Sequence, residues 1–193
     1  SWLVEETNDS KIVDIWKAAD ALIRVNKLDV PMLKKFNKNI FSIPNGYNHN
    51  KLSKMDKLKC REKLNLPKNK KITFSLGHLN NRKGFDILID SIKMIDEKTR
   101  RNLLVIIGGN GPEKASLEKK IRDFSLETIV KLQGFIDDAS ISLWLNSADF
   151  FILPSFSEGN PTVMFEALGC GRPFIGTNVG GIPEVIVDDE IGL

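Results

Sequence analysis

Short apolar segments that alternate with amphipathic segments constrain the fold of this chain more than any other feature. Five of them are as short and as rich in β-branched or aromatic side chains as strands are: residues 71–76, 103–107, 130–133, 150–153 and 173–176. The intervening segments repeat apolar residues at three- and four-residue steps, which predicts helices with one buried face. The alternation predicts an α/β fold with a doubly wound parallel sheet, whose ligand site lies at the carboxyl ends of the strands.

Local signals predict where several helices begin and end. Asn160 is a favourable N-cap before Pro161, which would then be the first helical residue. Asp138 is expected to cap the next helix upstream, because it stands just before an apolar repeat. An amphipathic helix is predicted over 52–64, and Pro67 shortly after it prevents its continuation.

The first 44 residues predict a smaller alternation of the same kind. The expected elements are a helix from Lys11, a strand over 21–25, a helix over 30–36 capped by Asp29, and a strand over 40–43. The last strand stops at Pro44-Asn45-Gly46, a turn-forming corner.

Composition narrows the class of protein. The net charge of +3 over 193 residues does not favour nucleic acid as a partner, and the lysines of residues 51–71 lie among leucines at helical spacing, as on a solvated helix face. No apolar run approaches the roughly 20 residues of a membrane span. Cys60 and Cys170 lack metal or redox spacing, and His49 and His78 are far from any such partner. We expect a cytoplasmic protein without a metal site, and peripheral contact with the inner membrane face stays open.

Residues 154–184 carry the strongest signal for chemistry. After an apolar strand, a glycine-containing turn leads into a helix, which presents unpaired N–H groups and a positive dipole end to an anion. Two carboxylates, Glu158 and Glu166, stand eight residues apart in this run. Each feature taken singly also fits a plain turn and a solvated helix residue. The crowding of glycines and prolines favours backbone that closely approaches a ligand.

Two other turns follow predicted strands. Residues 77–84 end in Arg82, Lys83 and Gly84, which suits a pyrophosphate, although surface cations in a polar loop give the same pattern. Residues 108–112, GGNGP, suggest a dinucleotide fingerprint, but Lys114 stands where the third glycine is needed. An NAD site is therefore disfavoured.

The run at 154–184 resembles the donor-binding half of retaining glycosyltransferases of the family 4 type (group 1). These enzymes are built from two facing Rossmann-like domains, the GT-B fold. Their usual run is close to PS-x-x-EG-x-P-x-x-x-x-EA-x-x-x-G-x-P-V-x-x-x-x-x-GG-x-x-E. The chain matches it at Pro154, Ser155, Glu158, Gly159, Pro161, Glu166, Ala167, Gly171, Pro173, Gly180, Gly181 and Glu184.

The resemblance implies a role for each motif residue. Glu158 would bind hydroxyls of the donor sugar near the reacting carbon, and Lys83 would hold the diphosphate. Glu166 would accept hydrogen bonds from the ribose hydroxyls. The N–H groups from Gly159 through Asn160 and Pro161 to Thr162 would border the sugar and phosphates, proline itself having no N–H. The nucleotide base would be bordered by Gly109, Gly134, Phe135 and Ile136.

One residue departs from the family pattern. The family's glycine-arginine turn ends in lysine-glycine, and Gly77 and Lys83 match that turn, but His78 occupies the arginine position. A neutral imidazole provides one donor and no full charge. Arg82, at the other end of the turn, is the candidate to supply the missing charge.

The resemblance also divides the chain. Residues 1–44 match the end of the acceptor-side domain and hinge, and residues 45–193 match the nucleotide-sugar domain, truncated at its C-terminus. The implied function is transfer of a sugar, with retention of configuration, from a UDP- or GDP-linked donor to a glycan, lipid or other acceptor in polysaccharide biosynthesis. No metal or other cofactor is implied, and this chain alone is expected to be inactive.

Two alternatives stay open. A nucleotide-sugar epimerase on the same fold would release nucleotide and an altered sugar without an acceptor. A non-catalytic nucleotide-binding domain would bind through the same turns without transfer. A glycogen-phosphorylase-like enzyme is disfavoured because no cofactor-binding lysine motif is evident.

Overall fold

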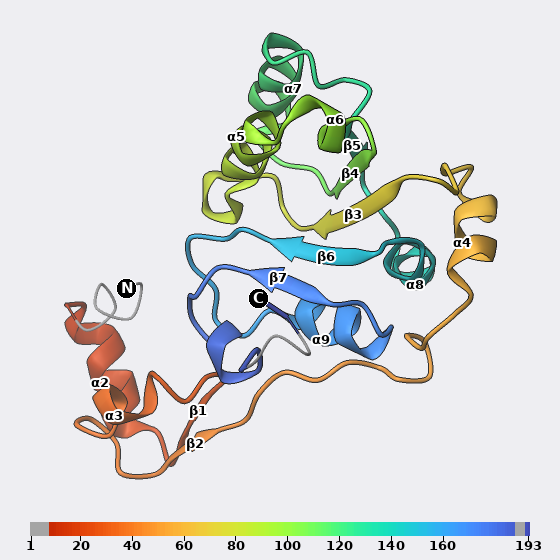
Figure 1. Cartoon of the computed structure of the whole chain (residues 1–193). Helices are drawn as coiled ribbons and strands as arrows, with labels where there is room; N and C mark the ends of the chain where they lie inside the picture. The colour runs from red at the N-terminus through yellow and green to blue at the C-terminus, as the bar shows by residue number, and fades with distance from the viewer. Residues whose placement is uncertain (1–7, 188–191) are drawn as a thin grey trace.

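A computed structural model of the chain describes residues 8–187 and 192–193, and a five-stranded sheet in which every strand pairing is parallel lies at its centre (Figure 1). In spatial order the strands are β5 (Val130–Gly134), β4 (Leu103–Gly108), β3 (Lys71–Leu76), β6 (Phe150–Leu153) and β7 (Phe174–Gly176). All five predicted strands are present, and β3 and β6 have the predicted bounds.

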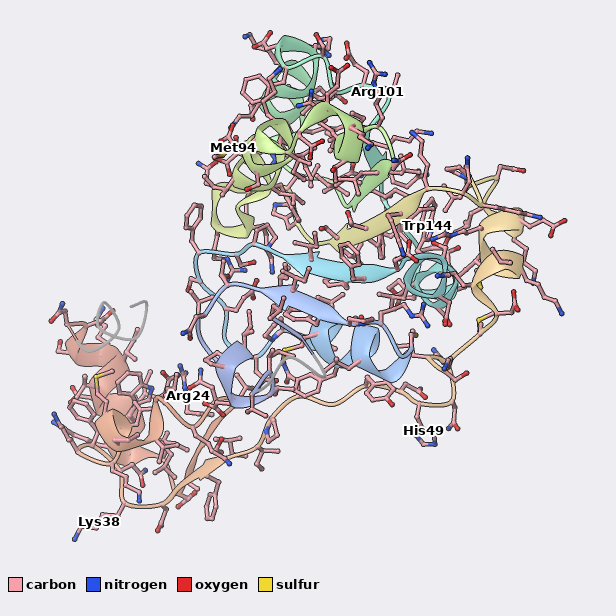
Figure 2. All side chains as sticks on the ribbon, viewed as in Figure 1. Arg24, Lys38, His49, Met94, Arg101 and Trp144 are labelled. Atoms are coloured by element: carbon pink, nitrogen blue, oxygen red, sulfur yellow. The ribbon has the colours of Figure 1, made fainter. Side chains whose placement is uncertain are left out.

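Helices cover both faces of this sheet. The helices that pack on it are α5 (Phe85–Met94), α7 (Lys114–Asp123), α8 (Asp138–Ser147) and α9 (Thr162–Gly169). In β4, Val105 and Ile107 join the apolar cluster that contains α5 and α7, whereas Leu104 and Ile106 join the cluster that contains α8 and α9. Trp144, labelled on α8 in Figure 2, stacks on Phe74 of β3 with 6.0 Å between ring centroids. The doubly wound α/β fold is therefore confirmed.

The strand order defines where a ligand would bind. From β3 the chain moves outward to β4 and β5, then returns to place β6 on the other side of β3. The helices that follow β3 and β6 therefore pack on opposite faces of the sheet. Folds of this kind bind ligands at the carboxyl ends of two such strands, and we call that place the crevice. Lys83 follows β3 and Glu158 follows β6.

The N-terminal segment, residues 8–44, forms a small unit beside the short helix η2 (Ile182–Glu184) (Figure 1). Its elements are α2 (Ser10–Ala18), β1 (Leu22–Arg24), α3 (Val30–Leu33) and β2 (Ile40–Ser42). β1 and β2 pair in parallel, with Ile23 opposite Phe41. These elements match the predicted order. Arg24, labelled in Figure 2, pairs with Asp29 at 2.6 Å.

That ion pair explains a local error in the prediction. Asp29 does occupy the position before α3, but its side chain makes no capping hydrogen bond, because its Oδ2 binds the Arg24 guanidinium instead. The helix also ends at Leu33 rather than at residue 36.

The predicted helix over 52–64 is wrong in its first half. The helix there is α4 (Lys57–Lys63), and Asp56 caps it by accepting the Lys59 N–H at 2.8 Å. The chain before Asp56 crosses α8, where Asn146 accepts the Met55 N–H at 2.8 Å. Tertiary hydrogen bonds of this kind therefore keep residues 52–56 out of the helix that their apolar spacing favours.

The cap of α8 is one residue earlier than predicted. Asp137, not Asp138, is the N-cap, and its carboxylate accepts the Ser140 N–H at 2.9 Å. Adjacent aspartates give nearly the same sequence signal, so local pattern could not separate them. The short helices η1 (Asn81–Lys83), α6 (Glu97–Arg100) and η2 (Ile182–Glu184) complete the described elements.

Candidate active site

The turns that follow β3 and β6 are joined to one another by backbone contacts. The Phe156 N–H donates to the Arg82 carbonyl at 2.8 Å. Gly84 has φ +64°, and a side chain there would overlap the Pro154 carbonyl oxygen. Glycine is required at this position both for its backbone conformation and for the close approach. The two turns on either side of the crevice therefore form one unit.

This unit brings Lys83 and Glu158 into contact. Lys83 Nζ lies 2.5 Å from Glu158 Oε1, and the two side chains are only 12% and 6% exposed. Ser155 Oγ donates to the same oxygen at 2.6 Å. Within the described residues, the second oxygen, Oε2, accepts no hydrogen bond. Two side chains that the sequence singled out in separate stretches thus contact one another at the crevice, and their roles toward a donor stay predictions.

The Lys83 side chain reaches Glu158 by passing over Gly77. A Cβ at Gly77 would lie 3.4 Å from Lys83 Cε, which is ordinary van der Waals contact. His78 and Arg82 are both exposed in the same turn, so neither takes part in the buried pair. The interpretation that Arg82 replaces the family arginine at His78 stays a prediction.

The turn after β4 supports the turn after β3. Gly109 has φ +128° and lies so close to Gly77 that a side chain would overlap the Gly77 carbonyl oxygen. The Leu79 N–H donates to the Asn110 carbonyl at 2.9 Å. The Gly109 N–H donates to the Gly134 carbonyl at 2.7 Å, which connects the turn after β5 as well.

The residues expected near the nucleotide base differ in exposure. Phe135 is 75% exposed, while Ile136 is buried in the core and packs against Gly108. Gly134 has φ +78°, and the space where a side chain would stand is open. The Ile136 side chain is therefore not available to a ligand, whereas the Phe135 ring is exposed to solvent.

The start of α9 differs from the prediction. Pro161, with ψ 118°, is the extended residue before the helix, and Thr162 is the first helical residue. Asn160 does not cap the helix, because its Oδ1 accepts the Asn45 N–H at 3.3 Å and its carbonyl accepts Asn45 Nδ2 at 2.5 Å. Asn160 is buried, and its Nδ2 has no hydrogen-bond partner among the described residues. Gly159 is exposed.

Glu166 lines a pocket of about 520 Å³ at the start of α9. Thr162 and Asp138 share this pocket, together with residues of the linker between β2 and α4: Gly46, Tyr47, Asn48, Lys51 and Leu52. Burial, and to a lesser extent the negative charge of Asp138, raise the pKa of the Glu166 carboxyl above its usual value. Glu166 is therefore not the plain solvated helix residue that its sequence context also allowed.

Four residues of this region were not identified as functional from the sequence. Ser155 was matched only as a motif letter, yet it holds Glu158. Asp138 was interpreted as a helix cap and Lys51 as part of a solvated helix face, and Tyr47 lies in a linker that gave no signal beyond a turn corner. For Asp138, the sequence signal was its position at the predicted start of a helix.

Three further observations concern the described part of the chain. It contains no group of three or more His, Cys, Asp or Glu side chains arranged to hold a metal ion. His49, labelled in Figure 2, lies on the linker and is exposed. None of the helices at residues 8–187 is long and apolar enough to cross a membrane.

The basic turn after β3 and the acidic turn after β6 therefore meet where the strand order of the parallel sheet reverses. The family Glycosyl transferases group 1 matches residues 56–193, more than two thirds of the chain. The chain therefore belongs to the Glycosyl transferases group 1 family, and its first 55 residues lie outside the matched range.

Individual relatives agree with this assignment. The chain is 33% identical over 141 residues to the amylovoran biosynthesis glycosyltransferase AmsK of Erwinia amylovora, covering 70% of this chain and 34% of that protein. It is 30% identical over 124 residues to the 2-deoxystreptamine N-acetyl-D-glucosaminyltransferase of Niallia circulans, covering 64% of this chain and 32% of that protein.

A solved structure shows the same fold. The Anabaena protein HepE in complex with UDP superposes with a TM-score of 0.84 at 24% identity, over 97% of this chain and 53% of that one. The chain thus spans about a third of the length of the two curated relatives and about half of the solved structure.

Proposed function

We propose that this chain supplies the donor site of an enzyme that transfers a sugar from a nucleoside-diphosphate sugar, UDP- or GDP-linked, to a glycan, lipid or other acceptor in polysaccharide biosynthesis. Transfer retains the anomeric configuration, needs no metal, and takes place in the cytoplasm. Residues 1–44 belong to the acceptor-side domain, and residues 45–193 form the donor domain. The contact between Lys83 and Glu158 at the strand-order reversal carries the proposal.

Lys83 and Glu158 would divide the work between the two halves of the donor. As the glycosidic bond breaks, negative charge grows on the departing diphosphate, and a fixed ammonium stabilises that charge most where water is largely excluded. Glu158 Oε2 is the oxygen with remaining capacity to accept a sugar hydroxyl. The ion pair holds Lys83 in place before the donor arrives, so little reorganisation is needed during the reaction.

The neighbouring groups fit the rest of the donor. Asn160 Nδ2 is a buried donor without a protein partner among the described residues, and a ligand or water oxygen would satisfy it. The pocket of about 520 Å³ beside Glu166 has the size of a small-molecule site. An ionised Glu166 there would accept both ribose hydroxyls. The complex of HepE with UDP, a protein of the same fold, supports this class of ligand.

Calorimetric titration with UDP and GDP tests donor binding. We expect Lys83→Ala to raise the dissociation constant about 10- to 100-fold, because a charge-assisted contact of about 1.5–3 kcal/mol is lost. Lys98→Ala is the matched control, since Lys98 is exposed on α6, away from the crevice. Arg82→Ala shows whether Arg82 supplies the charge missing at His78. If neither nucleotide binds while circular dichroism shows an intact fold, the proposal fails.

In Lys83→Ala, the largely buried Glu158 carboxylate also loses its cation, and its unpaired negative charge would repel the diphosphate. The double variant Lys83→Ala/Glu158→Gln removes that repulsion and isolates the loss of the lysine. Product analysis on the whole enzyme, with and without acceptor, separates the remaining alternatives. Release of nucleotide and an altered sugar without acceptor would indicate an epimerase, and binding without any turnover would indicate a binding domain.

A further inference from the structure

The last residue of the matched motif, Glu184, has no part in the donor site described above. It ends η2, whose first residue, Ile182, is buried in the core beneath α9. Its carboxylate extends away from the sheet to the N-terminal segment. Glu184 Oε1 accepts the Lys27 N–H at 2.6 Å and the Leu28 N–H at 3.2 Å. These N–H groups belong to the turn between β1 and α3.

The same turn of the N-terminal segment touches the loop that carries Glu158. We define the sugar loop as residues 158–160 and the facing turn as residues 25–28. Asn26 is buried, and its Nδ2 lies 3.5 Å from the Gly159 carbonyl oxygen, while its Oδ1 accepts the Asp29 N–H at 3.1 Å. A Cβ at Gly159 would lie 3.3 Å from Val25 Cγ2.

The glycine pair just before η2 completes the contact. The Gly181 N–H donates to the Gly159 carbonyl at 2.6 Å. Gly180 has φ +55°, and a side chain there would overlap the Glu158 carbonyl oxygen. The Gly159 carbonyl therefore accepts the Gly181 N–H and also lies near the Asn26 amide. A Cβ at Gly181 would lie 3.3 Å from Asn26 Cβ, so the sugar loop, the glycine pair and the facing turn meet at one place.

The order of elements along the chain shows how this contact can fix the position of the N-terminal segment. β1 runs directly into the facing turn, so whatever that turn contacts fixes the carboxyl end of β1. Along the chain, residue 28 is separated from Glu158 by β2, the linker and most of the sheet. Glu184 joins the facing turn directly to η2 through two charge-assisted hydrogen bonds, which are stronger than neutral ones.

We propose that Glu184 and Asn26 are positioning residues that hold the facing turn on the sugar loop. By doing so they fix the orientation of the N-terminal segment, and of the acceptor side to which it belongs, relative to the donor sugar. This inference rests on the proposed function, because it assigns the N-terminal segment to the acceptor side. Glu184 touches neither the donor nor the acceptor. It acts on the orientation of the two sides, which brings the reacting atoms closer to the geometry that the reaction requires.

Amide hydrogen exchange on this chain tests the contact without any need for activity. In Glu184→Ala we expect the Lys27 and Leu28 amides to exchange about tenfold faster or more, because charge-assisted hydrogen bonds that protect them are lost. In Glu184→Gln the retained side-chain oxygen preserves most of the protection. Glu127→Ala, at an exposed position outside the helices and strands, is the matched control and should leave both amides unchanged. Unchanged exchange in Glu184→Ala overturns the proposal.

Kinetics of the whole enzyme tests the positioning role. Glu184→Ala should leave the dissociation constant for UDP within about twofold and lower kcat/KM for transfer about 10- to 100-fold, since small misplacements of reacting groups have effects of this size. Glu184→Gln should restore most of that loss. If the amides loosen in Glu184→Ala but transfer is unchanged, the contact is a structural brace only and the positioning role is wrong. If the unmodified enzyme neither binds nucleotide nor transfers sugar, the proposed function fails, while the exchange measurement still reports on the contact.

Discussion

Two carboxylates at opposite ends of β6 show how differently the surrounding protein can occupy the same kind of group. Asp149 stands at the amino end of the strand and Glu158 follows its carboxyl end. Both are paired with basic side chains. Asp149 uses both oxygens, Oδ1 for Lys57 at 2.7 Å and Oδ2 for Arg61 and the Ile72 N–H at 2.8 Å each.

Glu158 differs in what it leaves unused. Its Oε1 takes both Lys83 and Ser155, and within the described residues its Oε2 takes no protein donor. Arg61 adds to the contrast, because its side chain is only 3% exposed and also donates to the backbone carbonyls of Ser147, Lys68 and Lys70. A carboxylate whose oxygens are all occupied by protein holds structure together, whereas one with an unoccupied oxygen in a crevice is available to a ligand.

The largest effect is expected from Asp149→Asn. The substitution leaves the buried Arg61 guanidinium without its charge partner, and removing one member of a buried pair costs about 3–5 kcal/mol. Urea unfolding measures it, with Asp123→Asn as control because the exposed Lys119–Asp123 pair should contribute less than about 1 kcal/mol. A loss no larger than that of the control would show that the Asp149 cluster is not structural.

Glu158→Gln should have the opposite profile. We expect transfer by the whole enzyme to fall about 10²- to 10³-fold, as when a fixed polar group at a developing charge is removed. Gln keeps an acceptor for Lys83 and Ser155 but removes the charge partner of Lys83, so the free energy of unfolding should fall by about 1–3 kcal/mol. We expect a smaller loss than for Asp149→Asn because the Lys83 ammonium can turn toward water, whereas Arg61 is also fixed by three backbone carbonyls. Combined activity assays and urea unfolding of the same preparation give both values. Destabilisation as large as that of Asp149→Asn would break the comparison.

Acid should act on Asp149 in a defined direction. Burial alone would raise the pKa of Asp149, but hydrogen bonds from Lys57, the Ile72 N–H and Arg61 outweigh it, so the pKa lies below its usual value. The stabilisation is fully present above the pKa of an unfolded aspartate, about 3.9, and is lost as the pH falls through the lower folded pKa. Urea midpoints between about pH 5 and 2 should therefore fall more steeply for the unmodified chain than for Asp149→Asn.

Glu166 should give the smallest effect and the opposite sign of pKa shift. Burial first, and Asp138 second, raise the pKa of Glu166, so it becomes protonated at a higher pH than an ordinary glutamate. If the ionised form binds the ribose hydroxyls, affinity for uridine should fall as the pH drops through that raised pKa, by less than about tenfold. Glu166→Gln should flatten this dependence in a fluorescence or calorimetric titration. An unchanged pH profile in Glu166→Gln would remove Glu166 from the site.

Much of the fold could be predicted because its signals are local. The bounds of β6 follow from a continuous apolar run and those of β3 from alternating apolar residues, and the doubly wound arrangement follows from the alternation of strands and helices. Errors arose where tertiary contacts compete with local preference. Asn160 has the chemistry of a helix cap, but Asn45, more than a hundred residues away, takes its side chain. No pattern within either stretch reveals that partner.

At the candidate site, local signals likewise identified single residues but not the partners that the fold brings to them. Lys83 and Glu158 were found separately, by a basic turn and by motif resemblance, and the structure shows their contact. The pocket beside Glu166 depends on Tyr47 and Lys51, which come from a linker without periodicity. The role of Glu184 could not be inferred from spacing, because the groups it binds are backbone N–H groups, which every sequence has.

The close approach of Gly84 to the Pro154 carbonyl bears on how such enzymes can be re-engineered. Because the Arg82 carbonyl also accepts the Phe156 N–H, the two turns share their shape, and neither can change length or backbone conformation alone. An attempt to alter donor preference by grafting one turn from a relative would import half of a matched pair. The two turns are therefore best exchanged together, as a single cassette drawn from one parent.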